Sequence, residues 1–384
     1  MMETQRLCQH ILIAAVFLSC VFAIFYMYHS PTINRLHCPA LQVSKHNDCA
    51  DACINHTQIR NNTCDVNLTV LNNQLKEAKP SSPSQTETLL LIWTPPFGRS
   101  IALESCSSLF QIEGCQLTED RSLFNTAHGI LFHHRDIHQD LSNMPTLPRP
   151  YFQKWVWMNM ESPSNSGLIP RLNDLFNLTT SYRRDSDITV PYGQTSERSA
   201  DDRTYQIPQK EKFICWIVSN WNPDHERSKY YDKLKEHVSV ETFGESFNRY
   251  ISDGDYPKLV SSCKFYLSFE NSKHEDYITE KLFNPMTLGT VPVVLGPSRK
   301  NYERFIPADS FIHVDDFKTA GELAQHLKVL HQNTDMYMKY FGWRGSYAVR
   351  GTLFGLEQAC RSCDHIRRNR NYQTVNDLNT WYWG

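Results

Sequence analysis

The stretch Lys264–Asp316, KFYLSFENSKHEDYITEKLFNPMTLGTVPVVLGPSRKNYERFIPADSFIHVDD, contains a strand, a helix and a second strand in succession. Its apolar runs Phe265–Phe269 and Val291–Leu295 predict the two strands, and a helical pattern begins near Asp276 between them. Strands joined by such a crossover are parallel, and parallel sheets place ligands at the carboxyl ends of their strands, beside the helix N-terminus. The sequence therefore predicts an α/β fold with a ligand site in the loop after the first strand.

The predicted helix has one apolar face and a glycine at its end. Four apolar residues recur at helical spacing: Ile278, Leu282, Phe283 and Met286. Gly289 is placed to cap the helix, and Pro285 should kink or shorten its last turn.

Polar side chains gather in the loop and in the first helical turn: Asn271, Tyr277, Glu280 and Lys281. Free N–H groups and the helix dipole favour an anion such as phosphate at this place. Lys281 would add a positive charge, Tyr277 a hydroxyl donor, and Glu280 an acceptor for ribose hydroxyls. A Glu-Lys pair in a first turn is also common on a solvated face, so this pattern alone leaves both interpretations open.

Composition limits the class of protein. The chain has 384 residues, 12% of them aromatic, which is enough for two domains with sizeable cores. Its formal net charge of -2 suggests no nucleic-acid partner.

The N-terminus predicts a membrane anchor. After a cytoplasmic tail of residues 1–10, the apolar run 11–28 is long enough to span a bilayer. Val21-Phe22-Ala23 could be cleaved by signal peptidase, but the apolar run continues past it, which favours an uncleaved anchor. All four N-x-[ST] sequons follow the anchor and place the rest of the chain in the lumen, in type II orientation: Asn55, Asn61, Asn67 and Asn177.

Residues 29–88 are polar and contain a Pro-Ser stretch, which predicts a stem. Its four cysteines have a symmetric spacing: Cys38, Cys49, Cys53 and Cys64. Leu68, Leu71 and Leu75 could start a short helical seam. A small disulfide hairpin and a homodimer contact through the stem both stay open.

Six further cysteines predict three disulfides in a secretory compartment: Cys106, Cys115, Cys215, Cys263, Cys360 and Cys363. They can pair in up to fifteen ways. Because a Cys360–Cys363 bridge would close a small strained ring, we prefer bonds from Cys106 and Cys115 to these two residues. Cys215 and Cys263 would then join neighbouring strands.

Further strands define two domains, residues 89–205 and residues 206–384 with a closing segment. The polar stretch 200–209 separates them. Apolar runs predict strands at Leu89–Trp93, Gly129–His133, Lys154–Met160 and Phe213–Val218. Beyond the last of these, Ser219, Asn220 and Arg227 precede or begin a predicted helix, where Arg227 is placed to bind phosphate.

Carboxylates in the first domain are candidates for two roles, a general base and a metal ligand. Glu161 follows the strand Lys154–Met160 among aromatic residues, as a general base would, although spacing alone favours a loop-capping or salt-bridged glutamate. Asp185 and Asp187 form a D-x-D triplet, a pattern that holds a manganese ion on a nucleotide sugar in one class of enzymes. Because Asp253-Gly254-Asp255 matches the same pattern, we interpret both triplets as structural and predict no metal site.

The sequence resembles the Golgi α-1,3-fucosyltransferases of glycosyltransferase family 10, closest to the members that make Lewis x, from about Leu89 to the C-terminus. The motifs that carry the resemblance are HHRDI (133–137), WVWMNMESP (155–163), YRRDSDITVPYG (182–193), VSNWNPDHERSKYY (218–231), FYLSFENS (265–272), HEDYITEKL (274–282) and VPVVLGPSRKNYERFIPADSFIHVDDF (291–317). The resemblance implies a GT-B fold, in which two Rossmann-like domains face a cleft. It implies a Golgi membrane protein with a lumenal catalytic domain.

The resemblance also implies the reaction, an inverting transfer of fucose from GDP-fucose to the 3-hydroxyl of N-acetylglucosamine in type 2 lactosamine chains of glycoproteins and glycolipids. It assigns Glu161 as the base and places His134, Arg135 and Asp136 toward the acceptor. The residues that it places toward the donor are Tyr192, Ser219, Asn220, Arg227, Asn271, Tyr277, Glu280 and Lys281. No cofactor is required, and a divalent metal would at most stimulate.

Two alternatives remain at this stage. One is a metal-dependent transferase that uses Asp185 and Asp187, and the other is a membrane-anchored glycan-binding ectodomain without catalysis. The basic and polar residues at the strand ends of the second domain argue against the ectodomain, because a glycan-binding surface needs no pyrophosphate site.

Overall fold

The computed structural model describes residues 87–101, 103, 106–198 and 205–384. The predicted anchor and its tail, the stem up to residue 86, and with them Asn55, Asn61, Asn67 and the stem cysteines, lie outside these residues. Within the described ranges, no helix is long and apolar enough to cross a membrane.

The first half contains a parallel sheet of six strands in the order β2-β1-β3-β4-β5-β6. The strands are β1 (Thr88–Thr94), β2 (Cys115–Thr118), β3 (Gly129–His133), β4 (Lys154–Asn159), β5 (Leu178–Ser181) and β6 (Ile188–Thr189). Alternate residues of β1 enter two different cores: Leu90 and Ile92 pack with α10 (Leu356–Arg368), and Leu91 packs in the cluster that contains Leu378 of α11 (Leu378–Trp383). This alternation is expected of a strand that is buried on both faces.

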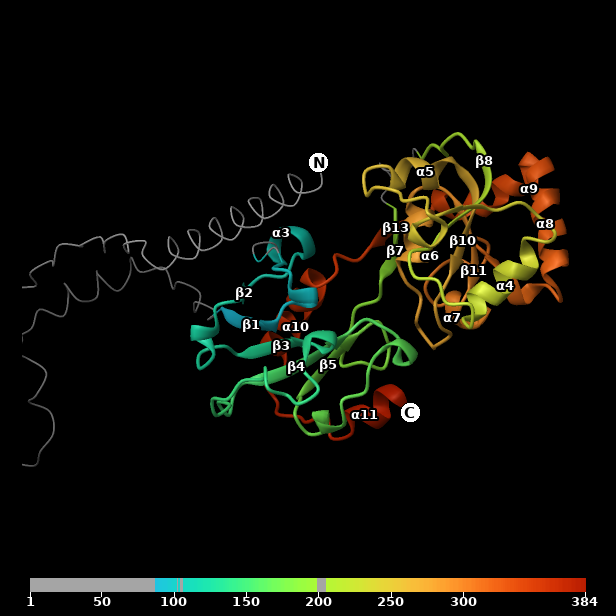
Figure 1. The fold of residues 1–384 in the computed structure, drawn as a ribbon. Helices are drawn as coiled ribbons and strands as arrows, with labels where there is room; N and C mark the ends of the chain where they lie inside the picture. Colours follow the sequence, from blue (N-terminus) through green and yellow to red (C-terminus); the bar gives the residue numbers. More distant parts are fainter. Residues whose placement is uncertain (1–86, 102, 104–105, 199–204) are drawn as a thin grey trace, which may run out of the picture. The chain divides into compact units, whose positions relative to one another are not determined.

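The second half contains a parallel sheet of five strands in the order β12-β11-β10-β8-β9. The strands are β8 (Lys212–Ile217), β9 (Glu241–Phe243), β10 (Cys263–Phe269), β11 (Val291–Leu295) and β12 (Ile312–His313). Figure 1 shows the helices that accompany this sheet: α4 (Glu226–Leu234), α5 (Tyr256–Ser262), α6 (Glu280–Thr287), α7 (Arg299–Tyr302), α8 (Ala320–Gln332) and α9 (Thr334–Met338). Both sheets are parallel, so the predicted α/β class is confirmed.

The central strand-helix-strand unit forms as expected, with a shorter helix. β10 and β11 pair in parallel, and α6 runs only from Glu280 to Thr287, with Pro285 inside it. Ile278 therefore precedes the helix, although it is buried with Leu282 in the same cluster. Gly289 has a φ of 78°, the left-handed conformation that suits a glycine after a helix end.

Three disulfides tie distant segments together. Cys106 is bonded to Cys360 and Cys115 to Cys363, while Cys215 joins β8 to Cys263 of β10. The first two bridges fix α3 (Cys106–Phe110) and β2 to α10.

The closing segment does not pack as the expected division into domains at residue 205 implies. We expected residues 206–384 to form the second domain, but α10 and α11 pack on the first sheet. The apolar face of α10, including Ala359 and Ile366, covers one face of the first sheet, and the two disulfides fix it there. A two-stranded antiparallel sheet of β7 (Gly193–Glu197) and β13 (Tyr347–Gly351) precedes α10.

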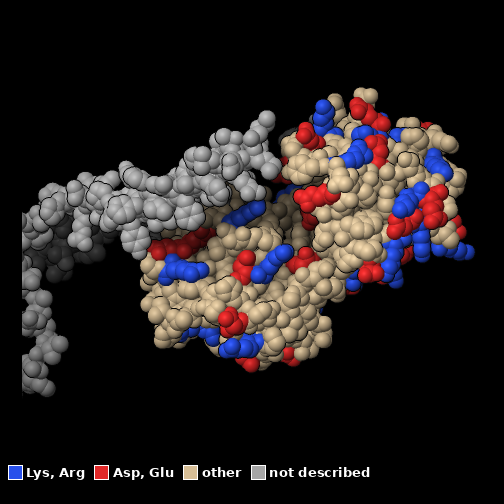
Figure 2. Space-filling model, in the orientation of Figure 1, with Lys and Arg blue, Asp and Glu red and all other residues tan. Residues whose placement is uncertain are grey.

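Acidic and basic side chains are interspersed on the face shown in Figure 2. This distribution agrees with the formal net charge of -2.

Candidate active site

Glu161 follows β4, a strand whose six residues are all buried. Its carboxylate oxygen Oε1 accepts hydrogen bonds from the Tyr277 hydroxyl at 2.6 Å and from the Ser162 N–H at 2.8 Å. Among the described residues, no hydrogen bond reaches Oε2. The protein thus holds this carboxylate through one oxygen.

Four tyrosines surround the Met160–Glu161 segment: Tyr182, Tyr192, Tyr277 and Tyr382. Tyr192 donates to the Met160 carbonyl, and Tyr382 of α11 donates to the Glu161 carbonyl. Burial raises the pKa of all four phenols well above its ordinary value, so they remain hydroxyl donors at neutral pH. The backbone and the side chain at Glu161 are therefore fixed from several sides.

Glu161 also lines a cavity of about 470 Å³, together with residues from both halves of the chain. Asn220 and Asn271, which follow β8 and β10 of the second sheet, lie in its wall with Tyr192. The structure thus brings several predicted donor residues to the predicted base. Ser219 precedes Asn220 but does not line this cavity.

Arg227 is the second residue of α4 and is 6% exposed. Its Nη2 donates to the Asn220 carbonyl, while its buried Nε has no hydrogen-bond partner within residues 87–101, 103, 106–198 and 205–384. Burial lowers the pKa of the guanidinium, and Glu270 and Tyr277 act against that effect. A buried cationic donor without a partner, near a helix N-terminus, is suited to an anionic ligand.

Lys281 lies in the first turn of α6 between two carboxylates. Its Nζ is 3.1 Å from Oε1 of Glu280 and 3.4 Å from Oε2 of Glu270. Burial disfavours the ammonium charge, but Glu270 and Glu280 outweigh burial and raise the pKa of Lys281. The two residues predicted to bind ribose and phosphate are therefore paired with each other in this structure.

Glu270 was missed by sequence reasoning. It follows β10 directly, is 2% exposed, and accepts hydrogen bonds from the Thr279 N–H at 2.8 Å and from the Thr279 hydroxyl. Burial raises its pKa. The available signal was a carboxylate directly after an apolar strand, the same signal that singled out Glu161.

The predicted acceptor residues follow β3 in a short 3-10 turn, His134–Asp136. Both ring nitrogens of His134 are engaged, because Trp157 donates to Nδ1 at 3.2 Å and Nε2 lies 2.8 Å from the Gly167 carbonyl. Burial lowers its pKa to about 4, so the ring is neutral. Both His134 and Arg135 line the cavity, and the Arg135 guanidinium lies over the Phe97 ring.

Asp136 does not line the cavity; it accepts from the Phe97 N–H at 2.8 Å and contacts Nδ1 of His133 at 2.5 Å. It therefore fixes the position of Phe97, which does line the cavity.

The two carboxylates of the metal-dependent alternative have separate protein partners. Asp185 is bonded to the Arg183 guanidinium and to the Trp381 indole N–H. Asp187 accepts from the Thr179 N–H and hydroxyl, each at 2.8 Å, and from Gln373. The part of the chain that the structure describes contains no group of three or more His, Cys, Asp or Glu residues suited to a metal ion.

The sequon residue Asn177 is 1% exposed. Its Nδ2, the atom that would carry a glycan, donates to the Gln373 carbonyl at 2.7 Å, and its Oδ1 accepts from the Trp155 N–H at 2.8 Å. Glycosylation at Asn177 stays a prediction, and it would require the bond to Gln373 to open.

Comparison with known proteins places these residues in a family context. Residues 85–193 match the model of the N-terminal region of fucosyltransferases, and residues 207–381 match that of the C-terminal region of glycosyltransferase family 10 (fucosyltransferase). The chain is 51% identical over 297 residues to the human 4-galactosyl-N-acetylglucosaminide 3-alpha-L-fucosyltransferase 9, covering 77% of this chain and 82% of that protein. It is 42% identical over 311 residues to a 3-galactosyl-N-acetylglucosaminide 4-alpha-L-fucosyltransferase of Bos taurus, covering 80% and 85%.

Solved structures of an alpha1,3-fucosyltransferase are also similar. The one with GDP-fucose has a TM-score of 0.49 and 17% identity, and the match covers 74% of this chain and 91% of that one.

Proposed function

The chain belongs to glycosyltransferase family 10, the fucosyltransferases, and from this premise we propose that it transfers fucose from GDP-fucose to the 3-hydroxyl of N-acetylglucosamine in type 2 lactosamine chains, with inversion. The named 3-alpha-L-fucosyltransferases at 51% identity support the regiochemistry, because they are described as acting on 4-galactosyl-N-acetylglucosaminide. The observation that carries the mechanism is the position of Glu161, with Oε1 held by Tyr277 and Ser162 and its side chain in the wall of the cavity.

In this mechanism Glu161 is the general base. GDP-fucose carries a β-linked nucleotide and the product is α-linked, so one direct displacement suffices and no covalent intermediate is required. The acceptor hydroxyl has a pKa far above 7, and Oε2 of Glu161 would accept its proton late in the transition state. The hydroxyl oxygen forms the new bond to the anomeric carbon as the bond to GDP breaks.

The departing diphosphate needs positive charge and N–H donors. Arg227 has an unpartnered buried Nε near the N-terminus of α4, and Lys281 lies in the first turn of α6. For Lys281 to reach phosphate, its ammonium group must share its interactions with Glu270 and Glu280. These groups would stabilise the charge that develops on GDP, which leaves no necessary task for a divalent ion.

We extend the proposal to organisation and location. The two parallel sheets would be the two domains of a GT-B fold, with the first domain binding the lactosamine acceptor and the second binding GDP-fucose. The chain would be a single-pass type II protein of the Golgi membrane with its catalytic part in the lumen. Glycoprotein and glycolipid chains ending in lactosamine would be its acceptors.

A panel of defined oligosaccharides tests this function. The soluble lumenal part is incubated with GDP-fucose and with type 2 lactosamine, type 1 lactosamine or sialylated type 2 lactosamine, and products are identified by mass spectrometry and NMR. We expect an α-1,3-linked product on type 2 lactosamine. Transfer only to the 4-hydroxyl of the type 1 chain, or no transfer to either, would contradict the proposal.

A further inference from the structure

The last helix, α11, contacts both ends of the loop that carries Glu161. Tyr382 donates its hydroxyl proton to the Glu161 carbonyl, and the Trp383 indole N–H donates to the Ser166 carbonyl at 3.0 Å. The donors lie 221 and 217 residues from these acceptors along the sequence. A loop held at two carbonyls by one helix has less freedom than a loop fixed only by its own turns.

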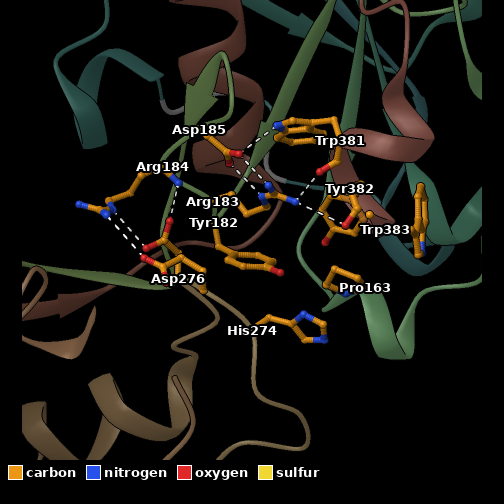
Figure 3. A pocket seen from close by; sticks show the side chains of 12 residues that line it. Pro163, Tyr182, Arg183, Arg184, Asp185, His274, Asp276, Trp381, Tyr382 and Trp383 are labelled. Carbon is orange, nitrogen blue, oxygen red and sulfur yellow. Dashed lines mark hydrogen bonds and ion pairs between the residues drawn. The ribbon is translucent and has the colours of Figure 1, made fainter. Parts of the chain in front are cut away.

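One of the contacts that hold this helix comes from Arg183. A helix of six residues has little stability of its own, so α11 needs tertiary contacts. Figure 3 shows the Arg183 guanidinium between Asp185 and the backbone of α11: Nη2 is 2.6 Å from Asp185 Oδ2, and Nη1 donates to the Trp381 carbonyl at 2.8 Å. The guanidinium also lies 4.5 Å from the centre of the Trp381 ring, whose N–H donates to Asp185.

We propose that Tyr382 and Trp383 are positioning residues for Glu161, and that Arg183 and Asp185 hold them in place. The proposal rests on Glu161 as the base. Tyr277 and Ser162 fix the carboxylate of Glu161, but the backbone that carries it is fixed at the Met160 carbonyl by Tyr192 and at the Glu161 carbonyl by Tyr382. Loss of one of these bonds would displace the carboxylate, and misplacement by about 1 Å can cost on the order of 100-fold in rate.

The first carboxylate of the D-x-D triplet thus has a task that requires no metal. The pocket beside α11 in Figure 3 is lined by charged groups that are paired with one another, Arg183 with Asp185 and Arg184 with Asp276. The Arg183–Asp185 pair, which contacts Trp381, supports the interpretation that this region holds α11 in place.

The test is a double-mutant cycle on the full-length protein. Tyr382→Phe removes only the hydroxyl and keeps the ring in contact with Trp157, at 4.8 Å between centroids. We expect kcat to fall about 10- to 100-fold while KM for GDP-fucose and the melting temperature stay close to wild type. In a Glu161→Gln background, Tyr382→Phe should lower kcat little further, because the effects of residues that act through one group are not additive.

Trp383→Phe, which loses the donor to Ser166, gives a second variant with the same expectation. Tyr337→Phe is the matched control, because Tyr337 is a buried phenol that donates to the Lys264 carbonyl at 3.0 Å, in the second half of the chain. Its kcat should equal that of the wild type.

The proposal is overturned if both α11 variants keep kcat within twofold of wild type, or if they lower the rate by the same factor with Gln at position 161. These results differ from failure of the proposed function, in which Glu161→Gln itself would keep its activity.

Discussion

At the residue scale, Glu161 as the proposed base would act through one carboxylate oxygen. Glu161→Gln keeps the shape and an oxygen that can accept from Tyr277, but it removes the proton acceptor. We expect turnover on type 2 lactosamine to fall roughly 10²- to 10⁴-fold with nearly unchanged GDP-fucose affinity, measured by product formation and calorimetry. Glu236→Gln, an exposed carboxylate beyond α4, is the control. Near-wild-type turnover of Glu161→Gln would show that the base lies elsewhere.

Arg227 and Lys281 carry the second prediction at this scale. Each substitution to Ala should weaken GDP binding by about 1.5 to 3 kcal/mol, because each loses a charge-assisted contact to phosphate. Lys281→Ala also leaves Glu270 and Glu280 without their shared cation, so it should have the larger effect. Calorimetry on folded variants measures this, with the exposed Lys235→Ala as control. Unchanged GDP affinity in both variants would refute it.

Residues that follow apolar strands were predictable, and their partners were not. Glu161 follows β4 of the first sheet, Asn220 and Asn271 follow β8 and β10 of the second, and the rule for parallel sheets places such residues at the carboxyl edge of their own sheet. Tyr382 could not be found this way, because it lies 221 residues from the carbonyl it contacts and no local pattern records that contact. The pairing of Lys281 with Glu270 likewise depends on how α6 packs against β10.

At the scale of elements, Glu357 links α10 to β13. Its carboxylate, 3% exposed, accepts from Arg350 at 2.8 Å and from Arg361 at 2.6 Å. Burial raises the pKa of Glu357, but the two guanidinium groups outweigh burial and hold it below its ordinary value of 4.5. The folded protein therefore binds this proton less tightly than the unfolded chain, and the carboxylate stabilises the fold above about pH 4.5.

Glu357→Gln should accordingly lower the free energy of unfolding at pH 7 by about 1 to 2 kcal/mol, since both arginines are partly solvated. The difference from wild type should shrink as the pH falls through the folded pKa of Glu357. Denaturant titrations at pH 7 and pH 4 measure it. A difference that stays constant between the two pH values would contradict the assigned pKa direction.

Some strands could be predicted from sequence patterns and others could not. The runs Gly129–His133 and Val291–Leu295 are strands with those bounds, as expected of continuous apolar runs in a parallel sheet that is buried on both faces. The strands β7 and β13 were not predicted, since neither is an apolar run and each depends on its partner for pairing. The closing segment was grouped with the second domain, whereas α10 packs on the first sheet, because an amphipathic helix does not specify which apolar face it covers.

At the scale of the molecule, two disulfides close nearly the same loop. The bonds Cys106–Cys360 and Cys115–Cys363 span 254 and 248 residues. With one bond intact, the other restrains only the short segments between them, 9 residues from 106 to 115 and 3 from 360 to 363. Loop-closure entropy then predicts that removing either bond first, by substituting its two cysteines with Ala, lowers the free energy of unfolding by about 3 kcal/mol. Removing the remaining bond as well should lower it by about a further 5 kcal/mol.

This order effect should appear whichever pair is removed first, in urea titrations of the two double variants and of the variant without both bonds. Equal costs for the first and second removal would mean that the bridges act independently. Replacement of Cys215 and Cys263, whose bond joins neighbouring strands β8 and β10, gives the comparison outside this loop.

Charge compensation for the leaving group is also a property of the whole molecule, because it needs helix N-termini and cations assembled around one ligand. Arg227 and Lys281 begin two different helices of the second sheet, and both N-termini add positive potential. Asp185 and Asp187 are instead bonded to Arg183 and Thr179. Fucosyl transfer, measured as released GDP, should therefore keep at least half of its rate in EDTA. Asp187→Asn should change the free energy of unfolding more than the free energy of GDP binding. Loss of activity in EDTA that Mn²⁺ restores, together with weakened GDP binding in Asp187→Asn, would instead support the metal-dependent alternative.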